Sequence, residues 1–111
     1  MKAFIIQPMK GRDDYDILKE REEIKAIASK HFKQDIEIID SFIDSITERK
    51  KNIPLQYLGK CIEMLSDADI VLLTDGWENA RGCKIEFQCV IEYKIPYYFV
   101  NPHSNIDHAI K

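Results

Sequence analysis

Cysteine is scarce in this sequence, and the few cysteines present are not spaced to pair. The chain contains Cys61, Cys83 and Cys89, an odd number without a Cys-x-x-Cys motif. This pattern argues against a disulfide framework and a structural zinc site, and it is typical of reduced thiols in the cytoplasm. The histidines supply no metal site either, because His31 continues an apolar helical face and the other two lie in a polar tail. Neither a metal nor a cofactor is therefore expected.

Long apolar runs and a basic stripe are also missing. Met1 and Lys2 lead into only four apolar residues, 3–6, before Gln7 and Pro8 end the run, so no secretory signal is expected. No run is long enough to cross a membrane. The 19 acidic and 16 basic residues are interspersed and leave a formal charge of −3, without the basic stripe that neutralises a phosphate backbone. These absences argue against membranes and nucleic acid polymers as partners.

What the sequence does contain is an alternation of short apolar runs with longer segments in which apolar residues recur at helical spacing. The runs at 3–6, 36–39, 70–73 and 97–100 predict four strands. The spacing predicts three helices between them, with core-facing residues Ile17, Leu18, Ile24, Ile27, Ala28 and Phe32 in the first, Leu55, Leu58, Ile62 and Leu65 in the second, and Cys83, Phe87, Val90 and Ile91 in the third. Residues 44–52 are polar without an apolar face and form a candidate loop or lid.

This alternation predicts one α/β domain over residues 1–111, with a parallel sheet and right-handed crossovers. We expect a three-layer, Rossmann-like or flavodoxin-like fold with four strands in the order 2-1-3-4, and the pattern leaves a fifth strand open. In such sheets, ligands bind beyond the carboxyl ends of the strands, where the strand order reverses. The loops 7–12 and 74–82 meet there, so the functional site is expected between them.

The segment 75–86 concentrates the chemistry that this site needs. Glu86 falls early in the third helix and leans toward its buried side, where a carboxylate is costly unless it is used or paired. The helix N-terminus favours the ionised form that a nucleophile requires. Gly82, without a side chain, lets a ligand approach. A structural alternative is that Glu86 pairs with Arg81 or a lysine and that Trp77 belongs to the core.

Three stretches of the chain resemble a small phage and bacterial family of the nucleoside 2-deoxyribosyltransferase-like superfamily. They are residues 7–11 (QPMKG), 57–60 (YLGK) and 76–83 (GWENARGC), the last leading to Glu86. In characterised members, a glutamate four residues after a glycine attacks the anomeric carbon of a nucleoside, expels the base and forms a glycosyl-enzyme. Gly82 and Glu86 have this spacing, so the resemblance implies that Glu86 is the nucleophile.

The resemblance also implies roles for the surrounding residues. The loop after the first strand would face the sugar or its phosphate, Trp77 would stack on a base, and Arg12 and Arg81 suggest an anionic ligand such as a nucleotide. Water as the acceptor gives a hydrolase and a second base gives a transferase, by the logic of a retaining glycosidase. The expected catalytic residues are Glu86, Asp75 and Asn79, and the expected substrate-binding residues are Gln7, Pro8, Met9, Gly11, Arg12, Asp40, Gly76, Trp77, Glu78, Arg81 and Gly82.

Two functions from different classes remain open at this point. The first is an N-glycosidic hydrolase or transferase that acts on a nucleoside or nucleotide. The second is a nucleotide sensor or sequestering protein, which needs the pocket and its arginines but no reactive carboxylate, so it would tolerate Glu86→Gln. A homodimer or higher homo-oligomer is expected in either case, because a small sheet has exposed edges and residues 93–99 carry more aromatic surface than a thin core covers.

Overall fold

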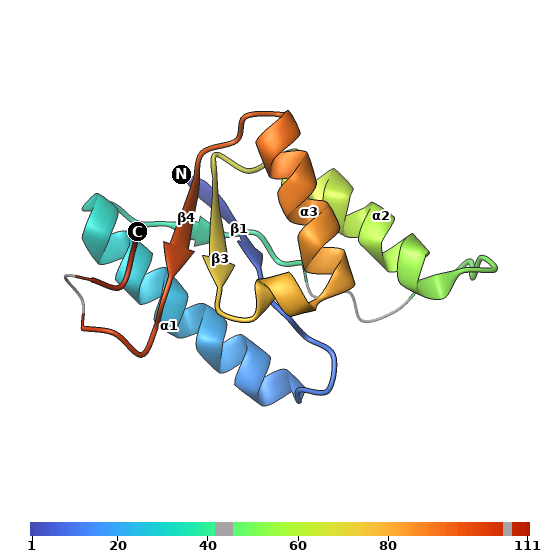
Figure 1. Ribbon diagram of the computed structural model, residues 1–111, viewed down its shortest axis with the longest axis horizontal. Helices are drawn as coiled ribbons and strands as arrows, with labels where there is room; N and C mark the ends of the chain where they lie inside the picture. The colour runs from blue at the N-terminus through green and yellow to red at the C-terminus, as the bar shows by residue number, and fades with distance from the viewer. Residues whose placement is uncertain (42–45, 106–107) are drawn as a thin grey trace.

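A computed structural model describes residues 1–41, 46–105 and 108–111 of the chain. Its elements follow the chain in the order β1 (Lys2–Ile6), α1 (Asp14–Phe32), β2 (Glu37–Ile38), α2 (Ile53–Leu65), β3 (Ile70–Thr74), the 3-10 turn η1 (Trp77–Asn79), α3 (Arg81–Glu92) and β4 (Tyr97–Val100). The strands form one parallel sheet with the order β2-β1-β3-β4 (Figure 1). The expected α/β fold and strand order are confirmed.

The two faces of the sheet carry separate hydrophobic cores, because successive strand residues point to opposite sides. On one face, Ala3 and Ile5 of β1 pack with Ile24 and Ala28 of α1. On the other face, the alternate residues of β1 and β3 pack with residues of α2 and α3. Figure 1 shows α1 on one side of the strands and α2 with α3 on the other. The domain is therefore a three-layer α/β/α arrangement.

The strand lengths reflect the position of each strand in the sheet. β3 lies between β1 and β4, and all five of its residues are buried, as expected for a run that is apolar on both faces. β2 is an edge strand with only Glu37 and Ile38 paired, shorter than the expected 36–39. Ile36 lies outside the ladder but is fully buried in the α1-facing core, so its apolar side chain reflects packing more than pairing.

Local sequence signals explain where the helices begin. α1 starts after Asp13, whose side chain accepts a hydrogen bond of 2.9 Å from the backbone N–H of Asp16. α2 starts after Asn52, whose side chain accepts one of 3.0 Å from the N–H of Leu55. Pro54 occupies the first turn of α2, where a missing N–H donor costs nothing. Each of these helices therefore begins after a residue whose side chain caps its first turn.

Three of the apolar residues assigned to buried helix faces are exposed, so that part of the prediction was wrong. They are Leu18, Leu55 and Ile91. Leu18 and Ile91 each follow a residue that is buried, Ile17 and Val90 respectively. Successive residues on a helix are about 100° apart, so the neighbour of the residue that points most directly into the core turns toward solvent.

The segments that follow β2 and β4 complete the fold. The fifth strand that the pattern left open does not form in the described ranges, but the chain end makes an antiparallel bridge from Ile110 to Val100 and thereby covers part of the outer edge of β4. Of the candidate lid, residues 44 and 45 lie outside the described residues, and residues 46–52 form no helix or strand. None of the helices in the described ranges has the length and hydropathy that crossing a membrane takes.

Candidate active site

The carboxyl ends of β1 and β3 lead into two loops that approach each other, as expected where the strand order reverses. Gly76 has a φ of 89°, a left-handed conformation that favours glycine, and a Cβ on it would lie 3.6 Å from Cγ of Pro8. These loops, α2 and the first turns of α3 enclose a cavity of about 660 Å³. The expected site residues that line it are Gln7, Pro8, Met9, Gly76, Asn79, Arg81, Gly82 and Glu86.

Glu86 lies in the second turn of α3 and is only 8% exposed. Burial raises the pKa of its carboxyl from 4.5 to about 7, although the positive charge of Arg21 acts in the opposite direction. The expectation that the helix N-terminus keeps this group ionised therefore needs correction, because burial has the larger effect. Near neutral pH, both the neutral and the ionised forms are populated.

Within the described parts of the chain, the Glu86 carboxyl makes no hydrogen bond or salt bridge. The alternative prediction, that Glu86 pairs with Arg81 or a lysine, was therefore wrong. The side chain is largely buried, and no direct contact with the described residues offsets the cost of its desolvation. Its side chain is available to a ligand in the cavity.

Arg21 brings a second buried charge to this region, and the sequence reasoning missed it. It is 6% exposed on α1, and it donates hydrogen bonds of 2.8 Å to Oε1 of Gln7 and to Oγ of Ser41. Burial lowers the pKa of Arg21, whereas the nearby negative groups, Asp40 first, act to raise it. The sequence indicated this burial in one way: Arg21 lies four residues after Ile17 and therefore on the buried side of the helix.

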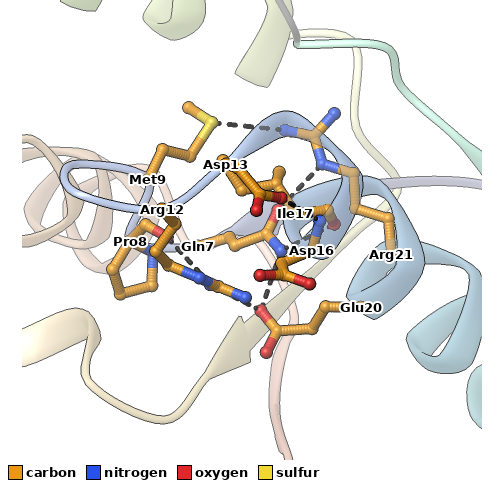
Figure 2. Close-up of polar contacts among 9 residues, drawn as sticks. All are labelled: Gln7, Pro8, Met9, Arg12, Asp13, Asp16, Ile17, Glu20 and Arg21. Atoms are coloured by element: carbon orange, nitrogen blue, oxygen red, sulfur yellow. Dashed lines mark hydrogen bonds and ion pairs between the residues drawn. The ribbon is translucent and has the colours of Figure 1, made fainter.

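Gln7 and Arg12, both expected to contact the substrate, are engaged in holding the loop after β1. The Nε2 amide of Gln7 donates to the backbone oxygen of Ile17 at 3.1 Å and to Oε1 of Glu20 at 2.8 Å. Nη1 of Arg12 donates to the same Glu20 oxygen at 3.1 Å and to the backbone oxygen of Pro8 at 3.0 Å (Figure 2). Both amide hydrogens of Gln7 are thus used within the protein.

A smaller cavity of about 240 Å³ adjoins the first, because Met9, Tyr57 and Cys61 line both. Arg12 and Asp14 also line the smaller cavity. Tyr57 is the aromatic residue that contacts both spaces, although the expected stacking residue was Trp77. The residues that line the two cavities range from the first turns of α3 to the start of α1.

The thiols that line the site are not set up as nucleophiles. Burial raises the pKa of Cys61 to about 11 and that of Cys83 to about 12, and the negative charge of Glu86 acts in the same direction. Both are therefore neutral thiols at physiological pH, whereas a reactive cysteine needs its thiolate. All three cysteines of the chain are free. No group of three metal-ligating side chains occurs within the residues that the structure describes.

Several expected site residues lie outside both cavities. The ring of Trp77 packs edge-on against Phe87, with centroids 4.7 Å apart, and also lies near Phe99. Its position in the core beside α3 and β4 matches the structural alternative for this residue. Asp40 has a side chain that is 84% exposed and lies 4.0 Å from Arg21. The other expected residues that line neither cavity are Gly11, Asp75 and Glu78.

The fold and site together define a small α/β domain with a candidate ligand cavity at the carboxyl ends of its strands. A family model described as a domain of unknown function, DUF4406, matches residues 1–98. The chain therefore belongs to the DUF4406 family. Neither a curated protein nor a solved structure matches the chain. All the residues that line the two cavities lie within the matched part of the chain.

Proposed function

We propose that this protein cleaves the N-glycosidic bond of a nucleoside or nucleotide, as a hydrolase or a transferase, with Glu86 as its nucleophile. The observation that carries this proposal is the buried Glu86 carboxyl, which lines the larger cavity and has no hydrogen bond or salt bridge with the described residues. A carboxyl that is costly to bury and unused by the fold is a candidate for work on a ligand. The superfamily resemblance at Gly82 and Glu86 supports the same assignment.

In this reaction, a carboxylate oxygen of Glu86 attacks the anomeric carbon of the sugar. The bond from that carbon to the base nitrogen breaks, its electron pair leaves with the base, and the base takes up a proton from water. Water then attacks the anomeric carbon of the glycosyl-enzyme and loses a proton to solvent. The bond from that carbon to the Glu86 oxygen breaks, which releases the sugar and restores the carboxylate; attack by a second base gives exchange instead. Because only the ionised form attacks, activity is expected to rise as the pH increases through about 7.

The charges around the cavity favour an anionic substrate, a nucleotide over a nucleoside. Arg81 and Lys10 line the larger cavity. No side chain caps the start of α3, so the N–H groups of its first turn add positive potential there. A Cβ on Gly82 would have Cδ1 of Leu58 as its nearest neighbour at 3.9 Å, so the missing side chain leaves space in the cavity. These features suit a phosphate group.

A nucleotide sensor or sequestering protein is the second candidate, and one observation favours it. Among the described residues that line the larger cavity, Glu86 is the sole carboxyl group. Asp75 and Glu78 lie outside that cavity, so they are not placed to protonate a leaving base. A protein that only binds a nucleotide needs no such acid.

The remaining parts of the proposal concern classification, location and assembly. The strand order and the spacing of Gly82 and Glu86 support a place in the nucleoside 2-deoxyribosyltransferase-like superfamily. The free cysteines support a cytoplasmic location. The exposed aromatic residues Tyr93, Tyr97 and Phe99 support a homodimer or a higher homo-oligomer.

The test is a chromatographic assay of base release and base exchange with a panel of nucleosides and 5′-nucleotides. The wild-type protein is compared with Glu86→Gln and with Glu92→Gln, a control that makes the same change at an exposed site on the same helix. The proposal expects turnover that is lost in Glu86→Gln and kept in Glu92→Gln. An absence of turnover, with nucleotide binding that survives Glu86→Gln, would instead support the sensor.

A further inference from the structure

Arg21 and Glu86 are the two charged side chains that are buried in the described ranges. They come from different layers, since α1 covers one face of the sheet and α3 the other (Figure 1). Both are nevertheless close to the carboxyl end of β1, because Arg21 donates to Gln7, and Gln7 lines the same cavity as Glu86. No salt bridge joins them, yet the charge of each acts on the ionisation of the other.

The guanidinium of Arg21 lies behind the wall of the site. Its Nε donates to Gln7, and its Nη2 donates to Ser41 and lies 3.9 Å from the sulfur of Met9. Gln7 and Met9 line the larger cavity, and Met9 and Ser41 line the smaller one. Figure 2 shows Arg21 directed toward Gln7 and Met9. Arg21 lines neither cavity, so it does not contact a ligand there directly.

We propose that Arg21 is a positioning residue, which holds the loop after β1 in place and supplies the buried positive charge that stabilises the Glu86 carboxylate. The proposal rests on the proposed function for the role of that carboxylate as a nucleophile. Arginine suits the position because its planar fork donates in several directions at once and remains charged when buried. A lysine keeps the charge but cannot reach Gln7 and Ser41 with the same geometry.

Other titratable groups also surround Glu86, and Arg21 differs from them in one respect. Among the residues that the structure describes, Arg21 is the one basic side chain that is buried. Lys10 and Arg81 are exposed, so water and salt screen their charges more strongly. The titratable groups that share the cavity with Glu86 or act on it are Arg21 from α1, Lys10 from the loop after β1, Tyr57 and Cys61 from α2, and Arg81 and Cys83 from α3.

The test follows the titration of the Glu86 carboxyl carbon by NMR in protein labelled with carbon-13 glutamate, with the signal assigned by its loss in Glu86→Gln. In Arg21→Met the midpoint is expected to rise by about one pH unit, because the stabilising charge is gone. Arg21→Lys and Ser41→Ala keep a cation, so their midpoints are expected to stay close to that of the wild type. An unchanged midpoint in Arg21→Met would overturn the proposal. If that variant does not fold, Arg21→Gln, which keeps a hydrogen-bonding amide, takes its place.

The pH dependence of base release separates this inference from the proposed function. In Arg21→Met, the acid limb of the rate profile is expected to move to higher pH together with the NMR midpoint. A purely structural role would lower the rate at every pH without moving that limb, which would contradict the inference. If the wild-type protein releases no base from any nucleotide, the proposed function fails, and the NMR midpoint still decides whether Arg21 stabilises the carboxylate.

Discussion

Replacing Glu86 by glutamine removes a buried charge while keeping the shape of the side chain. The pKa of Glu86 rises from 4.5 to about 7 on folding. A shift of this size means that folding disfavours the ionised form, relative to the neutral form, by about 3 kcal/mol. Because the folded pKa is the higher one, the stability that the neutral carboxyl contributes is fully present below pH 4.5, and it is lost as the pH rises through about 7. Glutamine cannot ionise, so it avoids that loss.

We therefore expect the free energy of unfolding of Glu86→Gln to rise by about 3 kcal/mol relative to that of the wild type between about pH 4 and about pH 8. Above that range the difference stays constant. In a chain of 111 residues this gain corresponds to a melting temperature about 13 °C higher on the alkaline side. Urea unfolding measures the difference at each pH, with fluorescence of the single tryptophan, Trp77, as the probe.

The difference between the two proteins is the relevant quantity, since the other titrating groups are common to both. Glu92→Gln serves as the control, because Glu92 is an exposed carboxyl at the end of the same helix. Its stability is expected to follow that of the wild type at every pH. A stability difference between wild type and Glu86→Gln that stays constant from acid to alkaline pH would refute the argument that burial perturbs this carboxyl.

Three further predictions concern the walls of the site. Gly76→Ala should cost about 1 to 2 kcal/mol in urea unfolding, since position 76 has a left-handed φ; an unchanged midpoint would contradict this. Gly82→Leu should fill the space beside Leu58 and abolish nucleotide binding in calorimetry, while Gly82→Ala keeps the wild-type stability. Cys61 and Cys83, neutral at physiological pH, should resist iodoacetamide in the native protein and react after denaturation, as mass spectrometry would show; rapid native alkylation of either would count against their burial.

The sequence was sufficient to predict the fold because the relevant signals are local. Each strand is a short apolar run, and alternation with helical segments restricts the sheet to few parallel arrangements. The position of the candidate cavity followed from the strand order, and the burial of Glu86 followed from its angular position beside Cys83. The faces of the helices were less certain, because a residue such as Leu18 borders the buried stripe without belonging to it.

The side-chain network of the site was not accessible from the sequence, because its hydrogen bonds join distant segments. Gln7 and Arg12 both contact Glu20, which lies more than one turn into α1, so neither is free in the way that the loop sequence suggested. Trp77 occurs in the right segment for a ligand contact, but the geometry of η1 directs its ring to Phe87. The charge of Arg21 concealed its burial, since arginine is rarely buried without partners.

We propose that Glu86 performs glycosidic chemistry in the cavity at the ends of β1 and β3. Base release from 5′-nucleotides, compared chromatographically between the wild-type protein and Glu86→Gln at equal concentration, tests it most directly. We expect free base with the wild type and none above background with Glu86→Gln. Equal release by both proteins, or none by the wild type, would contradict it.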